Sequence, residues 1–218
     1  MKKNCLLVQP GLIDYPSGLL LQQAARTLVA DGHHPGVLIL LEHPPVITIG
    51  RAGGNDNLLA DRQRLAAAGI AVVAADRGGN ITGHNPGQLV GYPILDLRRW
   101  RQDVHWYADR LEEVIIRTLA GFGLTAGRKA KYTGVWLGDE KIAAIGLSVR
   151  QWISGHGFAL NIDNDLSIFG GIVPCGIREF GVTSLRRAGA AADRAAVTAA
   201  LTVAFADVFD CTFTAGSL

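Results

Sequence analysis

The sequence has few of the features that mark a secreted or membrane-spanning protein. Its 218 residues include only three cysteines, which lie far apart in the chain, so neither a disulfide framework nor a CxxC zinc site is indicated. No apolar run approaches the roughly 18 residues of a spanning helix. The apolar run that follows Lys2 and Lys3 is too short for a secretory signal. These absences predict a reducing, cytoplasmic setting.

Charge of one sign is also scarce. The formal net charge is +2, and the 21 basic side chains are scattered rather than gathered in a stripe. Nucleic acid and anionic membranes select basic stripes, so neither is an expected partner. With 49% hydrophobic and 18% charged residues, the chain can bury a sizeable core. We expect one domain over residues 1–218, and a monomer.

Several motifs of catalysis and cofactor binding are missing. The sequence contains neither GxGxxG nor GxxxxGK[ST], and nothing resembles a GxSxG elbow. His33 and His34 stand side by side, and no other cluster has the spacing of metal ligands. We therefore expect no metal and no cofactor, and the warrant for nucleotide binding is weak.

Hydrophobic periodicity predicts three longer helices. The first runs from a cap at Ser17 to Gly32. The second starts near Asp103 and ends by Gly121 or Gly123, and the third spans residues 193–208. The expected inward faces are Leu20, Ala24, Leu28 and Val29 in the first helix, Tyr107, Leu111, Val114, Ile115 and Leu119 in the second, and Val197, Leu201, Ala204 and Val208 in the third.

Short strands alternate with glycine-rich turns. "GVLILLEHPPVITIG" predicts two strands broken at Pro44 and Pro45. A short helix at 61–68, a strand at 70–74, a loop at 77–88 and the strand "LVGYPILDL" follow. "KYTGVWLGDEKIAAIGLSVR" predicts a hairpin, and "HGFALNI" a further strand. Because hairpin signals outnumber βαβ signals, we predict an α+β fold with a mixed or mostly antiparallel sheet.

Cys175 stands between a proline and a glycine in "FGGIVPCGIREFGVTSL". Proline favours extended backbone before the thiol and Gly176 allows a sharp turn after it, so the sulfur would lie on a bend whose N–H groups could face an oxyanion. A nucleophilic thiol needs a partner that favours the thiolate, and His84, His156 or a lysine could serve. The commoner role of a free cysteine is that of a small buried apolar residue, the role we assign to Cys5 and Cys211.

Lys141 opens a predicted strand. The two-residue period places Lys141, Ala143, Ile145 and Leu147 on one face. On an inward face the ammonium would be desolvated and could relay protons, which arginine could not do. A lysine after a turn is usually solvated, but this chain has five lysines against sixteen arginines, so lysine is not its default cation.

The loop "RGGNITGHNPGQ" contains four glycines around Thr82 and His84. Such density allows a ligand to approach the backbone, and successive N–H groups can form a nest for oxygen. A turn-rich connection without any ligand is the plain alternative.

Five segments, in order between residues 50 and 185, together resemble the lipoyl/octanoyl transferase family, lipoate-protein ligase B. They are "GRAGGNDNLL", "RGGNITGHNPGQLVGYPILDL", "GVWLGDEKIAAIG", "HGFALNI" and "IVPCGIREFGVTSL". The resemblance implies the catalytic-domain fold of biotin and lipoate protein ligases, in which a sheet carries the acyl pocket and helices cover its back.

The resemblance also implies an acyltransferase of lipoate biosynthesis. Octanoate would arrive on acyl carrier protein, move to a cysteine as a thioester, and pass to a lysine on a lipoyl domain. The implied acceptors are the E2 subunits of 2-oxoacid dehydrogenases and the glycine cleavage H protein. No ATP would be needed, because exchange between thioesters is nearly balanced in energy.

Family roles fall on residues of this chain. The acyl-accepting cysteine of the "PCG" motif corresponds to Cys175, and the lysine that favours its thiolate corresponds to Lys141. The Gly78–Gly79 turn is a candidate for the oxyanion site. The implied substrate-binding residues are Arg77, Gly78, Gly79, Asn80, Ile81, Thr82, Gly83, His84, Ala144, Ile145, Gly146, Gly157, Phe158 and Ala159.

Two positions depart from the family pattern T-aromatic-H-G-P-G-Q. Gly83 stands where the aromatic residue belongs, and Asn85 stands where a glycine belongs. A missing ring beside the acyl site would reshape the pocket and alter the preferred chain length. Asn85 tolerates the positive φ that glycine often supplies, so the turn itself should persist.

Three other functions remain open on the residues alone. An ATP-dependent lipoate or biotin ligase shares the implied fold but has no need of Cys175. A thioesterase would pass the acyl group to water. A module that only binds acyl carrier protein would form no covalent adduct.

Overall fold

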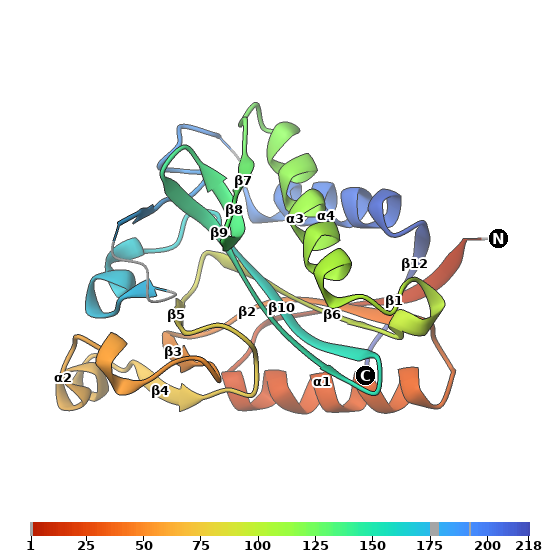
Figure 1. Ribbon diagram of the computed structural model, residues 1–218, viewed down its shortest axis with the longest axis horizontal. Helices are drawn as coiled ribbons and strands as arrows, with labels where there is room; N and C mark the ends of the chain where they lie inside the picture. The colour runs from red at the N-terminus through yellow and green to blue at the C-terminus, as the bar shows by residue number, and fades with distance from the viewer. Residues whose placement is uncertain (1, 175–178, 192) are drawn as a thin grey trace.

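The strands form one large and one small sheet. A computed structural model describes residues 2–174, 179–191 and 193–218 (Figure 1). Within these residues the large sheet has the order β12-β1-β2-β6-β10-β9-β8-β7 with β11 beside β9, and the small sheet has the order β4-β3-β5. The large sheet comprises β1 (Lys3–Leu12), β2 (Gly36–Glu42), β6 (Gln88–Leu95), β7 (Gly127–Lys129), β8 (Tyr132–Leu137), β9 (Glu140–Arg150), β10 (Ile153–Asn161), β11 (Gly181–Val182) and β12 (Cys211–Ala215), and the small sheet β3 (Val46–Ile49), β4 (Ala71–Ala74) and β5 (Ile81–His84).

Pairing directions in the large sheet are mixed. Strands β12, β1 and β2 run parallel to one another, whereas β2, β6, β10, β9, β8 and β7 pair in antiparallel fashion. The small sheet is mixed too, since β3 is parallel to β4 and antiparallel to β5. The predicted α+β class with a mixed sheet is confirmed.

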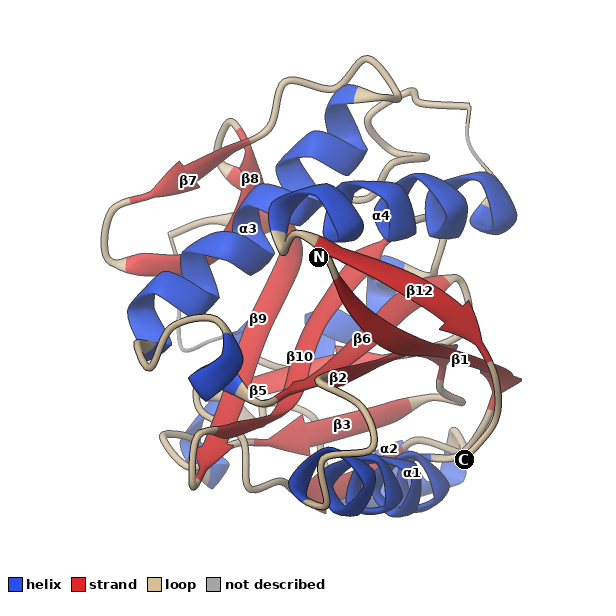
Figure 2. Ribbon diagram, turned by 90° about the vertical axis from the view of Figure 1, so that its right-hand side faces the viewer, coloured by secondary structure: helices blue, strands red, loops and turns tan. Residues whose placement is uncertain are grey.

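Helices cover both faces of the large sheet. Figure 2 shows α3 (Val104–Ala120) and α4 (Arg194–Val208) on one face and α1 (Tyr15–Ala30) on the other. Leu38 and Leu40 of β2 pack in the α3–α4 core, whereas Val37, Ile39 and Leu41 pack in the α1 core. Because both faces are covered, all seven residues of β2 are buried, which explains its continuous apolar sequence.

The longest helix matches its prediction closely. Asp103 caps α3 by accepting a hydrogen bond from the Trp106 N–H, and the helix ends at Gly121. The predicted inward residues Tyr107, Leu111, Val114, Ile115 and Leu119 are all fully buried. In α4, capped by Asp193, the predicted residues Val197, Leu201 and Ala204 are buried as well.

The predicted cap of α1 is wrong, and its predicted inward face is right only at Val29. Asp14, not Ser17, is the N-cap, and it accepts from the Ser17 N–H at 2.7 Å. Leu20, expected inside, is 66% exposed. The buried residues are Tyr15, Gly18, Gln22, Ala25 and Val29. Two of the contact positions are small and one is polar, so a hydrophobicity pattern selected the wrong stripe.

The shorter elements are mostly as expected. Strands β2 and β3, the helix α2 (Arg62–Ala67), strand β4, the β8–β9 hairpin and β10 all lie where the sequence predicts them. The segment predicted as a loop contains β5, which pairs with β3. Short 3₁₀ turns complete the chain: η1 (Asn55–Asn57), η2 (Leu97–Arg99) and η3 (Leu166–Gly171).

The sequence analysis did not predict strands β1 and β12. Their pairing brings the elements that contain Cys5 and Cys211 together. The strands are parallel neighbours, with Lys3 opposite Cys211. Cys5 and Cys211 are both buried in the α3–α4 core as free thiols. Their separation in the chain therefore gave no indication of their separation in space. In the described part of the chain, no helix is long and apolar enough to cross a membrane.

Candidate active site

A cavity lies where the segment around β5 faces β9 and β10. Its wall is mostly apolar and main-chain, with a few polar side chains. It is lined by Tyr15, Arg77, Gly79, Asn80, Ile81, Thr82, His84, Val90, Tyr92, Ala144, Ile145, Gly146, His156, Gly157, Phe158 and Ala159. An uncharged, extended ligand suits such a wall.

The structure brings together three segments that the resemblance selected as substrate-binding. Residues 77–84, 144–146 and 157–159 meet because β9 and β10 are paired, with Gly146 opposite Gly157 and Ala144 opposite Ala159. Every residue selected from these segments lines the cavity except Gly78 and Gly83.

Gly78 and Gly83 contact other parts of the chain instead of the cavity. The Gly78 N–H donates to the Leu147 carbonyl at 2.6 Å, so it is not available for an oxyanion, contrary to our expectation. A Cβ on Gly83 would point at Ile168, 3.2 Å away, and not into the cavity. The aromatic residue of the family pattern would therefore occupy the space of Ile168, so its absence does not by itself widen the cavity.

The other departure, Asn85, joins the loop to its neighbours. Its side-chain amide donates to the Asp165 carbonyl at 2.8 Å and accepts from Asn164 at 3.0 Å. Asn85 does not adopt a positive φ; Gly87 does, at 89°. The turn persists, as expected, and it does so through side-chain hydrogen bonds of Asn85, without use of its tolerance for a positive φ.

Sequence reasoning missed several lining residues. Tyr15 comes from α1, and Val90 and Tyr92 come from β6. Tyr15 follows the cap of α1 and carried no motif. His156, considered only as a partner for the thiol, was not selected as a lining residue. Nothing short of the packing of α1 and β6 against β10 would have revealed Tyr15, Val90 and Tyr92.

The histidines in and beside the cavity are held neutral, because burial lowers their pKa values. Complete burial lowers the pKa of His84 to about 3. Gln88 donates its amide to Asn161 and Gly83, so its oxygen faces the His84 Nδ1, which donates at 2.7 Å. Burial also lowers the pKa of His43, whose Nε2 lies 2.7 Å from the Tyr92 hydroxyl.

His156 is held in an unusual conformation. Its φ is 54°, in the left-handed region that a residue other than glycine rarely adopts. Its N–H donates to Gln22 at 2.8 Å, and its Nε2 lies 2.6 Å from the Asp76 carboxylate. Burial lowers the pKa of His156 and Asp76 opposes that shift, with burial the larger cause.

Arg77, which lines the cavity, bonds to the small sheet. The side chain is buried, and its Nη2 donates to the carbonyl and the hydroxyl of Thr48 on β3, at 2.7 and 2.8 Å. Its neighbour Gly78 bonds to β9 through Leu147. Arg77 and the adjacent Gly78 thus connect β3 to β9.

A register shift in β9 changes which side chains share a face. Val135 of β8 pairs with Ala143, but Trp136 pairs with Lys141, so β9 contains one extra residue. Ile142 and Ala143 accordingly both pack in the α3–α4 core, joined by Ile145 and Leu147. The predicted face of Lys141, Ala143, Ile145 and Leu147 is wrong, because alternation resumes only after this bulge. Lys141 lies on the opposite face.

The Lys141 side chain is buried beside β8. It is 7% exposed. Its Nζ donates to the Thr133 carbonyl at 3.1 Å and lies 4.7 Å from the centroid of the Trp136 ring. The prediction of a desolvated lysine is confirmed, whereas the solvated-turn alternative is wrong.

Cys175 lies outside the described residues. The chain on either side of residues 175–178 is anchored. The Val173 N–H donates to the Asn57 carbonyl, and the Phe180 ring packs edge-on against Trp136, with centroids 5.3 Å apart. Two residues further on, Val182 of β11 is the partner of Lys141. The segment that follows Cys175 thus returns to the ring and the strand that hold Lys141.

Among the residues that the structure describes, no cluster of three His, Cys, Asp or Glu side chains could hold a metal ion. His33 and His34, which the sequence analysis set aside as ligands, follow α1; His33 is exposed and His34 is half-buried.

Sequence comparison identifies a family. The profile of the lipoyl protein ligase A/B catalytic domain matches residues 14–206. An octanoyltransferase of Solibacter usitatus is 50% identical over 208 residues, which is 95% of this chain and 94% of that protein.

Solved structures share the fold. A bi-partite lipoate protein ligase, from a Thermoplasma acidophilum lipoylation system that includes an E2 lipoyl domain, matches with a TM-score of 0.73 and 17% identity, covering 100% of this chain and 88% of that one. The biotin protein ligase of Aquifex aeolicus matches with a TM-score of 0.54 and 12% identity, covering 96% of this chain and 70% of that one. The expected biotin and lipoate protein ligase fold is confirmed.

Proposed function

Because the chain belongs to the lipoyl protein ligase A/B catalytic-domain family, we propose that it moves an octanoyl group from acyl carrier protein to its own Cys175 and then to a lipoyl-domain lysine. It is an acyltransferase that acts in protein lipoylation as an octanoyltransferase, like its curated relatives. The Cys175 thioester and the acyl carrier protein donor are the proposed steps, and each has its own test below.

The observation that carries the proposal is the cavity between residues 77–84 and the paired strands β9 and β10. Its wall offers an acyl chain apolar side chains and bare main chain, and its histidines carry no charge at neutral pH. Burying eight carbons at about 0.8 kcal/mol for each methylene would contribute several kcal/mol to acyl binding. Shorter acyl groups would bind correspondingly less well.

In the first proposed step the Cys175 thiolate attacks the carbonyl carbon of octanoyl acyl carrier protein. A carbon–sulfur bond forms to Cys175, and the carbon–sulfur bond to the carrier's phosphopantetheine breaks. The Lys141 ammonium stabilises the attacking thiolate and gives a proton to the departing one. One thioester replaces another, so the step needs no ATP.

In the second proposed step the amine of a lipoyl-domain lysine attacks the Cys175 thioester. The carbon–nitrogen bond forms, the carbon–sulfur bond to Cys175 breaks, and the proton of the amine passes to Lys141, which lost one in the first step. Lys141 therefore ends each cycle as the ammonium with which it began.

Partners and setting form part of the same proposal. The expected donor is acyl carrier protein, and the expected acceptors are lipoyl domains of 2-oxoacid dehydrogenase E2 subunits and the glycine cleavage H protein. A fold match to the ligase of a system with an E2 lipoyl domain supports this acceptor class. The 218 residues would act as one catalytic domain. A reducing cytoplasm would keep Cys175 as a thiol, and Cys5 and Cys211 are free thiols here.

The test is the mass of the intact protein after exposure to octanoyl acyl carrier protein. The wild-type chain should gain one octanoyl group, located on Cys175 by peptide mapping, and the Cys175→Ala variant should gain none. Cys211→Ala is the matched control and should acylate normally, because that thiol is buried in the core. Undiminished acylation of Cys175→Ala would remove Cys175 from the mechanism.

The same reaction mixtures separate the other candidate functions. Octanoyl transfer to a lipoyl domain without ATP excludes an ATP-dependent ligase. Free octanoate released in step with loss of the thioester would instead indicate a thioesterase. Tight binding of acyl carrier protein without any adduct would indicate a binding module.

A further inference from the structure

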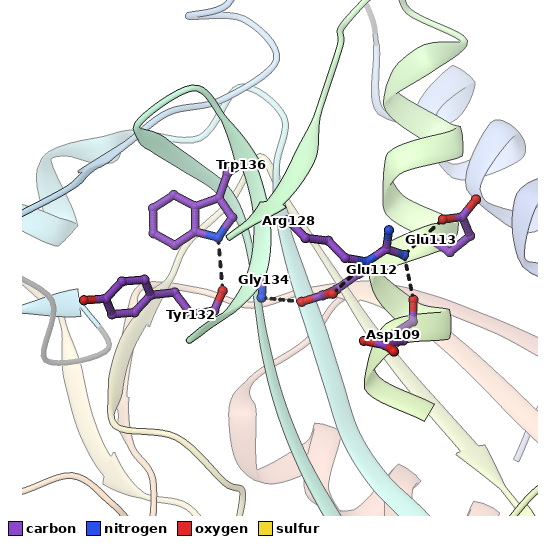
Figure 3. Close-up of polar contacts among 7 residues, drawn as sticks. All are labelled: Asp109, Glu112, Glu113, Arg128, Tyr132, Gly134 and Trp136. Carbon is purple, nitrogen blue, oxygen red and sulfur yellow. Dashed lines mark hydrogen bonds and ion pairs between the residues drawn. The ribbon is translucent and has the colours of Figure 1, made fainter. Parts of the chain in front are cut away.

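The carboxylate of Glu112, on the opposite side of the sheet from Lys141, accepts a hydrogen bond from the strand that Lys141 contacts. Glu112 lies on α3, on the face of the large sheet that α3 and α4 cover, and is 5% exposed. Figure 3 shows its carboxylate between Arg128 and the main chain of Gly134. One oxygen accepts from the Gly134 N–H at 2.8 Å and the other from the Arg128 Nε at 3.0 Å.

The Gly134 N–H and the Thr133 carbonyl belong to one peptide group. Glu112 accepts from the N–H end, and the Lys141 ammonium donates to the carbonyl end at 3.1 Å. The peptide dipole has its positive end at the N–H and its negative end at the carbonyl. A carboxylate at the first end and an ammonium at the second both stabilise it, so the three groups polarise one another.

Gly134 is the residue that permits this arrangement. Its φ is 132°, a conformation that L side chains rarely adopt. A Cβ there would lie 2.7 Å from the Ala143 carbonyl oxygen and 3.4 Å from the Lys141 Nζ. The absence of a side chain therefore lets the ammonium approach the strand.

We infer that Glu112 is a positioning residue for Lys141, acting through the Thr133–Gly134 peptide group. A buried ammonium is costly unless it is compensated, and a carbonyl polarised by a carboxylate compensates it better than an ordinary carbonyl does. The inference rests on the proposed function for its consequence in catalysis, because Lys141 acts there on Cys175. The link between Glu112 and Lys141 itself can be measured without any acyl transfer.

The first measurement is the NMR resonance of the Gly134 amide. Substitution Glu112→Gln keeps an oxygen near the N–H but removes its charge, so the Gly134 amide proton should move upfield. Lys141→Met should move the same resonance, because it acts on the other end of the peptide group. If Lys141→Met leaves the Gly134 amide and the Thr133 carbonyl carbon unchanged, the inference is overturned, whether or not Glu112→Gln folds.

The second measurement is the rate of alkylation of Cys175 at neutral pH, resolved by peptide mass. Glu112→Gln should slow alkylation by roughly tenfold, as expected for loss of one charge-assisted hydrogen bond. In the Lys141→Met background the same substitution should cause no further loss. If Glu112→Gln slows alkylation equally in the wild-type and Lys141→Met backgrounds, Glu112 acts only through the stability of the fold. If it slows alkylation in neither background, Glu112 does not position Lys141.

Glu113→Gln is the matched control on the same helix. It removes ion pairs to Arg117 and Arg128 but leaves Glu112 bonded to Gly134. Alkylation and the Gly134 amide should be unchanged. A different result separates this inference from the proposed function: if Lys141→Met moves the Gly134 amide yet does not slow alkylation, the pairing of Lys141 with Cys175 fails while the link to Glu112 stands.

Discussion

The two faces of β9 differ in how they use the same strand. On the face toward α3 and α4, Ile142 and Ala143 are buried in the core. On the other face, Lys141 lies buried against Trp136, and Ala144 and Gly146 leave open the space that forms the cavity. The extra residue at the bulge places Ile142 and Ala143 on the same face and leaves Lys141 on the other. Stability is therefore concentrated on one face and chemistry on the other, and substitutions should affect them separately.

The largest effect should come from Lys141→Met on the cavity-side face. We expect acyl transfer to fall by roughly a thousandfold, because the substitution removes both the thiolate partner and the proton acceptor. The melting temperature should change little. Lys129→Met is the control, since Lys129 also lies over the Trp136 ring, at 5.5 Å, but is paired with the exposed Asp139. Comparable losses in the two variants would contradict the assignment.

A core substitution should do the reverse. Leu111→Ala leaves a void among fully buried residues of the α3–α4 core and should lower the unfolding free energy by about 3 kcal/mol. Urea denaturation measures the cost. Acyl transfer per folded molecule should remain within about twofold of wild type, and a large loss of transfer in fully folded protein would show that the two faces are not separate.

Lowering the pH should reduce the free energy of unfolding through protonation of His84. Its pKa in the folded protein is about 3, against an ordinary value of 6.5, so the unfolded chain takes up a proton first as the pH falls. The stabilising contribution is complete above pH 6.5 and is lost progressively toward pH 3. Between pH 6.5 and pH 5 we expect a loss of about 2 kcal/mol in unfolding free energy. His84→Gln should flatten this slope, and an unchanged slope would contradict it.

The smallest effect should distinguish two neighbouring alanines. Ala144→Leu adds carbons on the cavity side and should weaken octanoyl transfer by about tenfold while favouring a shorter acyl chain, since each lost methylene contact is worth about 0.8 kcal/mol. Ala143→Leu adds the same atoms to a fully buried site and should lower stability by about 1–3 kcal/mol instead. Competition between hexanoyl and octanoyl donors measures the first, and thermal unfolding the second. Identical behaviour would place both alanines on one face.

Local signals predicted the fold well wherever one residue type decides the structure. Aspartate at 103 began α3, and Pro44 and Pro45 separated β2 from β3. Prediction failed where distant segments decide. The inward face of α1 contains Gly18 and Gln22 because α1 packs closely on the sheet, and β5 exists because β3 pairs with it. The pairing of β1 with β12 joins opposite ends of the sequence.

The candidate site shows the same division. The order of motifs was enough to select the segments that meet at the cavity, yet Tyr15 and Tyr92 reach it only through the packing of α1 and β6. Lys141 was selected for a sound reason, its desolvation, but assigned to the wrong face because a bulge interrupts strand alternation without a sequence signal. The sequence carried no signal for Glu112, because its partner is a main-chain N–H of another element.

The way that Arg77 spans the two sheets limits how the enzyme can adapt to other acyl groups. Its guanidinium bonds to Thr48 on one side, while the adjacent Gly78 is bonded to Leu147 on the other. The Arg77 side chain and the main chain of Gly78 thus form one connection between β3 and β9, beside the main-chain bonds of residues 50–52 to residues 77–80. Evolution of a broader acyl specificity would have to proceed by trimming the lining side chains, because moving the walls apart would first break both attachments.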